Sequence, residues 1–202
     1  GYSAESLNMD IVDEDSVRSS VSRVMDTAGK LDVMVNCAGI AGPTNTKILD
    51  YTTEAFDDIC EVNLRGSYLM TKHAIQPMLD QDYGRILLYS SIGGKEGNPG
   101  MCGYAATKAA LHGIVKSLAR EVGGSGITVN AVAPGLIATE MSEGYLSASS
   151  EAYREQTKQL WAFRAVDRLL TPDDVAHAVR FLCMDASDAH TGQIIQLDGG
   201  LY

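Results

Sequence analysis

A tyrosine and a lysine stand four positions apart in GYAATKAAL, residues 103–111, and could form an acid–base pair. On a helix, Tyr104 and Lys108 would share one face, a turn apart. A lysine cation there stabilises a phenolate, and lowering a tyrosine pKa from about 10 to about 7 takes on the order of 4 kcal/mol. Such a tyrosine could give a proton to a carbonyl oxygen or remove one from an alcohol. Because the same spacing occurs on ordinary helix surfaces, the pair needs support from other residues.

Three more polar side chains follow short apolar runs that are expected to be strands. In a doubly wound sheet, ligands bind outside the carboxyl ends of the strands, so these side chains are expected along one rim. Ser91, which lies 13 residues before Tyr104, could hydrogen-bond the same substrate oxygen as the tyrosine. The three are Asn36, Ser91 and Thr139, in the segments NCAG (36–39), SSIGG (90–94) and PGLIATEM (134–141).

The elements that must position these residues alternate along the chain. The apolar runs lack the polar alternation of half-exposed strands, which indicates strands buried on both faces of a parallel sheet. Expected strands are Leu31–Val35, Arg85–Ser90, Ile127–Ala133 and Gln193–Leu197, with Ser6–Asp10 as a weaker candidate. Expected helices are Asp13–Ala28, Glu54–Asp80 with a bend near Gly66, Tyr104–Val122, and 171–184, which opens with the capping sequence TPDD. The pattern predicts an α/β fold: a doubly wound, Rossmann-like parallel sheet with helices on both faces.

Composition sets limits on partners. At 202 residues the chain is expected to form a single domain, 1–202, and a net charge of −10 argues against nucleic acid or an anionic membrane as a partner. A nucleotide cofactor stays compatible, because helix N-termini bind phosphates whatever the net charge. The four cysteines and four histidines show no metal-ligand spacing, so we expect free thiols and no metal site. With no apolar run of ~18 residues, a cytoplasmic location is expected.

Five motifs together resemble the short-chain dehydrogenase/reductase family in their order and spacing. They are NCAG, VNLRG (62–66), SSIGG with its serine 13 residues before YAATK, PGLIAT and DGG (198–200). The resemblance covers essentially the whole chain. It implies an oxidoreductase that interconverts a secondary alcohol and a ketone by hydride transfer, with NAD or NADP as cofactor.

The resemblance also implies roles for individual residues. Tyr104 would be the general acid/base, Lys108 would lower its pKa and hold the nicotinamide ribose, and Ser91 would orient the substrate carbonyl. Asn63 would hold the water of a proton relay, although a polar residue in a kinked helix explains it equally well. Cofactor contacts would come from Asp10, Asn36, Ala38, Gly39, Tyr104, Lys108, Pro134, Gly135, Ile137 and Thr139. Asp10 could instead cap the acidic helix that follows it.

The substrate side is expected to include Ser91 and Tyr104 and a lid over residues 141–165. Other expected lining residues are Met101, Cys102, Met141, Tyr145 and Trp161, though those of the lid could equally be lid-to-core contacts. A sugar acid, a polyol or a 3-oxoacyl thioester would suit this lining. The family pairs its two long central helices between subunits, which implies a homodimer or homotetramer.

One family element does not occur in these 202 residues. The glycine-rich TGxxxGxG cofactor turn is missing, and Gly1–Asp10 matches the approach to the family's third strand. The N-terminal β-α units, with the residue that separates NAD from NADP, would therefore lie before Gly1. Two interpretations are open: a fragment of a longer dehydrogenase, or a truncated noncatalytic relative that acts in binding or assembly.

Overall fold

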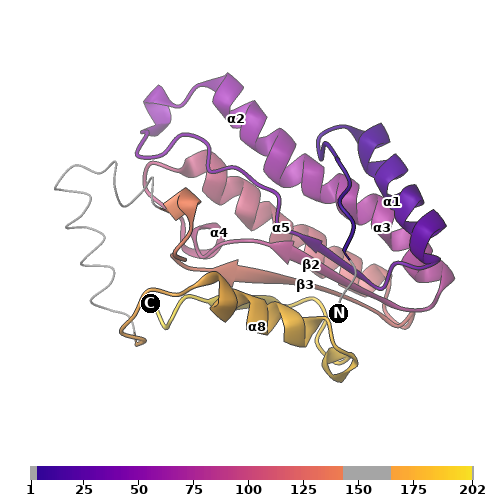
Figure 1. The fold of residues 1–202 in the computed structure, drawn as a ribbon. Helices are drawn as coiled ribbons and strands as arrows, with labels where there is room; N and C mark the ends of the chain where they lie inside the picture. Colours follow the sequence, from indigo (N-terminus) through magenta and orange to yellow (C-terminus); the bar gives the residue numbers. More distant parts are fainter. Residues whose placement is uncertain (1–3, 143–164, 202) are drawn as a thin grey trace.

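Four parallel strands form the sheet of the computed structural model, which describes residues 4–142 and 165–201 (Figure 1). They lie side by side in sequence order: β1 (Val33–Asn36), β2 (Gly84–Tyr89), β3 (Ile127–Pro134) and β4 (Ile194–Leu197). Every neighbouring pair is parallel, so each connection must cross over the sheet. The four strongest strand predictions and the parallel α/β class are confirmed.

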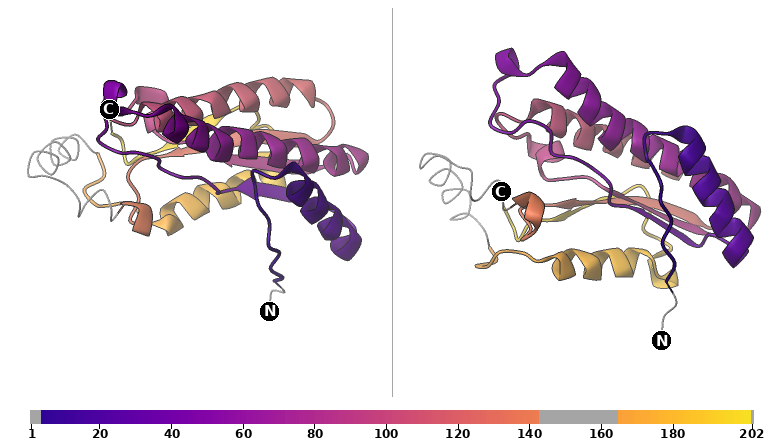
Figure 2. Two further views of the ribbon diagram at one scale, coloured as in Figure 1. Left: turned by 90° about the horizontal axis from the view of Figure 1, so that it is seen from above. Right: turned by 45° about the horizontal axis from the view of Figure 1, so that its top comes forward.

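Helices cover both faces of this sheet, as predicted. One face carries a continuous helical path, α2 (Thr53–Ile59), η2 (Cys60–Gly66) and α3 (Ser67–Asp80), which runs beside α5 (Cys102–Glu121) (Figure 2). The other face carries α8 (Pro172–Leu182), as Figure 1 shows. The remaining elements are α1 (Glu14–Ala28), η1 (Ile48–Asp50), α4 (Gly93–Glu96) and η3 (Asp185–Ser187).

The core lies in two layers because successive strand residues point to opposite faces. Ile86 and Leu88 pack with Leu111 and Val115 of α5, whereas Leu87 packs with Val175 of α8. The three β2 side chains are fully buried. A strand that is apolar at consecutive positions thus holds helices against both of its faces, and this fixes α5 over the carboxyl end of β2.

Helix ends follow the capping residues. Asp13 caps α1 by accepting a hydrogen bond from the Asp15 amide, and Gly29 ends that helix with a φ of 72°. At the start of α8, the Asp174 carboxylate accepts a hydrogen bond from the Thr171 amide at 2.7 Å. The neighbouring Arg168 guanidinium holds the pKa of Asp174 well below its usual range. The TPDD start of this helix is therefore confirmed.

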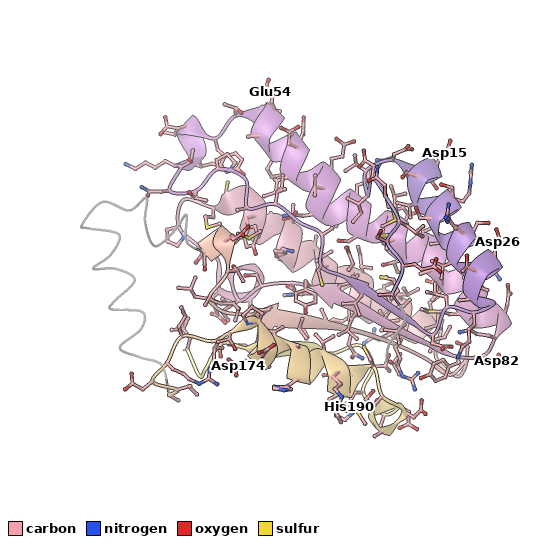
Figure 3. All side chains as sticks on the ribbon, viewed as in Figure 1. Asp15, Asp26, Glu54, Asp82, Asp174 and His190 are labelled. Carbon is pink, nitrogen blue, oxygen red and sulfur yellow. The ribbon has the colours of Figure 1, made fainter. Side chains whose placement is uncertain are left out.

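The acidic charge is spread over the outside of the fold. The labelled carboxylates Asp15 and Asp26 project from α1, and Glu54 projects from α2 (Figure 3). All three side chains are exposed. No helix within residues 4–142 and 165–201 combines the length and the apolar character that a membrane crossing requires.

Two elements differ from their predictions. Ser6–Asp10, within the described residues, forms no strand, because none of the described strands lies beside it and the Asp10 amide instead donates to Ser16 Oγ at 3.0 Å. The predicted helix 54–80 begins one residue earlier and changes from α to π geometry over Cys60–Gly66. Gly66, where a bend was predicted, ends the π segment, and a Cβ there would lie 2.9 Å from Ile11. π segments are rare and are frequent at functional sites.

Candidate active site

The carboxyl ends of the strands and the start of α5 meet at one edge of the sheet, at the left in Figure 1. Asn36 ends β1, Ser91 follows β2 by two residues, and Thr139 follows β3. Tyr104 and Lys108 lie in the first two turns of α5. Parallel strands thus bring to one rim residues that are more than 100 positions apart in the chain.

Ser91 and Tyr104 lie side by side at the rim. Burial raises the pKa of Tyr104 above its ordinary value and outweighs the effect of the neighbouring Ser91 hydroxyl, which favours the phenolate. The Gly93 amide donates to Ser91 Oγ at 3.1 Å. A Cβ at Gly93 would lie 3.5 Å from Ser91 Oγ and 3.7 Å from the Tyr104 ring, so this glycine leaves space beside both side chains. The two hydroxyls are placed to bond one substrate oxygen.

Lys108 is nearly buried beneath this pair. Its Nζ donates to the Tyr89 carbonyl at 2.7 Å and lies 5.7 Å from the centre of the Tyr104 ring. Burial lowers the pKa of Lys108 to about 8, against a small opposing effect of Cys37. Burial of the phenol sets the direction of the Tyr104 pKa shift, and the expectation that Lys108 lowers this pKa stays a prediction.

Asn63 is fully buried within the π segment. Its amide exchanges two hydrogen bonds with the backbone of Ile40, at 2.8 and 2.9 Å, and donates a third to Thr107 Oγ1 at 3.2 Å. Both N–H groups of the amide are therefore used in joining the loop after β1 to α5. The Asn63 side chain thus holds the loop after β1 against α5, and its part in holding a relay water stays a prediction.

The Asn36 side chain of the NCAG loop is turned into the fold. Asn36 is buried: its Nδ2 donates to Ser67 Oγ at 2.9 Å and its Oδ1 accepts from the Ala38 amide at 3.1 Å. A Cβ on Gly39 would lie 3.1 Å from Asn63 Oδ1 and 3.3 Å from Lys108 Nζ. Only glycine leaves those two polar atoms in place, so the loop fits a ligand that approaches the backbone at Ala38 and Gly39.

The third loop is held from two sides. The Gly135 amide donates to the Leu197 carbonyl at 2.9 Å, and a Cβ on Gly135 would lie 2.8 Å from Asp198 Cβ. Ser142 Oγ accepts from the Thr139 amide at 2.9 Å and donates to the Thr139 carbonyl at 2.7 Å. These contacts fix the backbone from Pro134 through Ile137, which pairs with Leu170, to the exposed side chain of Thr139.

The remaining predicted residues lie around this centre. The Asp10 carboxylate accepts from the Val12 amide at 3.1 Å, and since Asp13 is the cap of α1, the capping interpretation of Asp10 is wrong. Met101 is buried, Cys102 is half-buried, and Met141 is half-exposed. Tyr145, Trp161 and most of the expected lid lie outside the described residues.

Several residues of the site were not predicted. Thr107 holds Asn63, Gly93 makes room beside Ser91, and Ser90 contacts both the Lys108 carbonyl and His112. His112 could have been found from spacing, because it follows Lys108 by four residues and therefore shares the helix face that carries the tyrosine.

Comparison with known proteins places the chain among oxidoreductases. The family model described as enoyl-(acyl carrier protein) reductase matches residues 1–202. The 3-oxoacyl-[acyl-carrier-protein] reductase FabG of Aquifex aeolicus is 34% identical over 203 residues, covering 100% of this chain and 78% of that protein. FabG of Rickettsia conorii is 38% identical over 200 residues, covering 99% of this chain and 77% of the relative.

Solved structures give the same result. A short-chain type dehydrogenase/reductase from Mycobacterium ulcerans superposes with a TM-score of 0.88 at 30% identity, covering 96% of this chain and 68% of that one. ElxO with NADP bound superposes with a TM-score of 0.87 at 31% identity, covering 96% of this chain and 77% of that one. The match over the full chain and the strand-end placement of Ser91, Tyr104 and Lys108 lead to one conclusion. The chain belongs to the short-chain dehydrogenase/reductase family and is an NAD(P)-dependent oxidoreductase.

Proposed function

We propose that this protein reduces a 3-oxoacyl thioester to the 3-hydroxyacyl thioester with NAD(P)H. The observation that carries the reaction type is the placement of the Ser91 hydroxyl beside the Tyr104 phenol, one helical turn from the buried Lys108. The substrate class is supported by the names of the Aquifex and Rickettsia relatives and by the apolar Met101 and Met141 near the tyrosine. Sugar acids and polyols, which would need more polar partners, are less well supported.

The protein groups divide the work of the reduction. A bound nicotinamide cofactor would supply the hydride for the carbonyl carbon. Ser91 Oγ donates a hydrogen bond to the carbonyl oxygen and holds it near the Tyr104 hydroxyl, which gives its proton to that oxygen as negative charge develops there. The phenolate left on Tyr104 is stabilised by the Lys108 ammonium, whose pKa of about 8 keeps it largely cationic at neutral pH.

The chain's own residues fit the cofactor on the rim side of this pair. Lys108 Nζ spends one N–H on Tyr89, which leaves two donors for ribose hydroxyls. The backbone of Ala38 and Gly39 would pass along the cofactor, and the Ile137 backbone with the Thr139 side chain would hold its carboxamide. The proposed cofactor-binding set also includes Asp10, Asn36, Pro134 and Gly135. Asn36 and Gly135 would act by fixing the conformation of the backbone around them, without contacting the cofactor themselves.

We also propose that two copies pair through the outer faces of α3 and α5. Two neighbouring pockets there share Tyr68 and Ile114; Leu64 of η2 lines one of them, and Ile75 and Leu118 line the other. Tyr68 is 50% exposed, which is a large apolar surface to leave in water. Tyr68→Glu should shift the sedimentation of the protein to that of a smaller species, whereas Phe181→Glu, at a partly exposed side chain of α8, should not. Equal behaviour of the two variants would exclude this interface.

A substrate panel tests the proposed reaction. Initial rates are measured with 3-oxoacyl thioesters, keto forms of sugar acids and ketose sugars, each with NADH and NADPH, together with cofactor affinity by fluorescence titration. The proposal expects the thioester to have the highest kcat/KM with the preferred cofactor. Higher kcat/KM for a sugar-derived ketone would overturn the substrate class. Absence of cofactor binding at millimolar concentration would overturn catalysis and support the noncatalytic alternative.

A further inference from the structure

Ser90 joins three elements just before the proposed catalytic serine. It is 4% exposed, and its amide donates to the Val132 carbonyl at 2.8 Å, which continues the β2–β3 ladder beyond the last strand residue. Its hydroxyl reaches the opposite way, to the Lys108 carbonyl at 2.9 Å and to His112 Nε2 at 2.7 Å, both on α5. One buried side chain thus ties the end of the sheet to the helix that carries Tyr104.

The hydrogen atoms can be assigned from these contacts. The Lys108 carbonyl can only accept, so the single O–H of Ser90 donates to it. The Ser90 oxygen then accepts from His112, which requires the proton of the imidazole to sit on Nε2. Burial, with Lys116 on α5 and Lys95 on α4 as the nearby cations, lowers the pKa of His112, so the ring is neutral near pH 7. The Nε2–H donor is present in the protonated ring as well.

Lys108 is consequently held at both ends. Its ammonium donates to the Tyr89 carbonyl, and its backbone carbonyl accepts from the hydroxyl of Ser90, the residue that follows Tyr89. Gly94 closes the contact, because a Cβ there would lie only 2.7 Å from the Lys108 carbonyl carbon. Ser91 leaves the strand directly from this anchored point. Its distance to Tyr104 therefore depends on how firmly Ser90 is attached to α5.

We propose that His112 is a positioning residue for the reaction: its Nε2–H locks the Ser90 hydroxyl onto the Lys108 carbonyl and thereby fixes Ser91 relative to Tyr104 and Lys108. The inference rests on the proposed function, since it assigns a role within that site. His112 contacts Ser90 and not the reacting atoms, so it acts only through the serine. Removing its donor leaves cofactor contacts in place but loosens the alignment of the hydroxyls that bind the substrate oxygen.

The test uses two variants that differ in one donor. In His112→Gln the amide Nε2 stands at the same number of bonds from the backbone as the imidazole Nε2 and can donate to Ser90. His112→Met has nearly the same length and no donor. We expect kcat to fall about threefold to tenfold in H112M, the loss of one neutral hydrogen bond, and to return within about twofold of wild type in H112Q. KM for the cofactor should stay within about twofold in both, a split that general destabilisation would not produce.

Two further measurements make the outcome decisive. In a Ser90→Ala background, H112M should cause no additional loss of kcat, because its only route of action is gone. The Ser90 and Ile92 amides, bonded to Val132 and Pro134, should exchange with deuterium about threefold to tenfold faster in H112M than in H112Q. Equal kcat in H112M and H112Q, or full additivity with S90A, would overturn the positioning role. If the wild-type protein shows no turnover, the proposed function fails. Equal exchange rates in H112M and H112Q would separately overturn the role of His112 in holding Ser90.

Discussion

The ammonium of Lys108 lies 2.7 Å from the carbonyl oxygen of Tyr89, inside the protein and below the phenol of Tyr104. The lysine therefore serves the sheet and the site at once: one N–H ties α5 to the end of β2, and its charge faces the rim where a ligand would sit. A buried cation in this position lowers the free energy of unfolding. Its charge is retained at a site where a ligand would bind, as is common where function and stability conflict.

Replacing this lysine should separate stability from activity. Burial lowers the pKa of Lys108 to about 8, from 10.5 in the unfolded chain. Between these values the unfolded chain binds more protons, so this group's contribution to stability is present above pH 10.5 and is lost as the pH falls through 8. Lys108→Met should thus raise the free energy of unfolding at pH 7 by about 1–3 kcal/mol, the loss of the Tyr89 contact offsetting part of the gain.

Urea unfolding between pH 7 and 10.5 measures this effect, with exposed Lys116→Met as the matched control. K108M should lack the rise in stability above pH 8 that wild type and K116M show, and its turnover should fall by about 100-fold or more. A K108M protein that is less stable than wild type at every pH, with the same slope, would contradict the buried-cation account.

Gly39→Ala should weaken cofactor binding without a comparable loss of stability. The new Cβ would press on Asn63 Oδ1 and Lys108 Nζ, at 3.1 and 3.3 Å, and displace the ammonium that is proposed to hold the ribose. We expect the Kd for NAD(P)H to rise about tenfold, or about 1.4 kcal/mol. Gly123→Ala, where the Cβ would meet only ordinary contacts, is the control. Equal affinities in the two variants would remove Gly39 from the cofactor site.

Two buried asparagines allow a paired test of Asn63. Asn63 is bonded to the Ile40 backbone and Asn130 is bonded to His190 and Gln193, and both are fully buried. Leucine at either position leaves buried backbone groups unpaired and should lower the free energy of unfolding by about 2–4 kcal/mol. Only N63L should also reduce kcat, by about tenfold or more, because it releases the loop beside Lys108. An equal kcat for N63L and N130L in their folded states would make Asn63 purely structural.

The elements predicted correctly were those that depend on residues close together in the sequence. Consecutive apolar residues at Ile86 and Leu87 indicated a strand buried on both faces, and TPDD specified the start of α8. The π geometry around Asn63 was not predictable in this way, because it accompanies contacts with Ile40 and Thr107 that exist only after folding.

Two other outcomes follow from long-range pairing. The segment Ser6–Asp10 is only a weaker strand candidate by sequence, and a strand needs a neighbour, which it lacks among the described residues. The contact between Ser90 and His112 crosses 22 positions and depends on how closely α5 approaches β2. The local spacing pattern was enough to place Tyr104 and Lys108 on one helix face. The residues that hold them in place could not be predicted, because those contacts form only when α5 packs on the sheet.

The assignment of Tyr104 as the proton donor is tested most directly by single-turnover reduction of a 3-oxoacyl thioester by Tyr104→Phe. Tyr83→Phe, which removes a phenol bonded to Asp185 away from the rim, is the control. The account predicts that the rate of NAD(P)H oxidation falls about 10²–10⁴-fold in Y104F while the Kd for the cofactor stays within about twofold of wild type, and that Y83F behaves as wild type. A Y104F protein that reduces the substrate at the wild-type rate would contradict it.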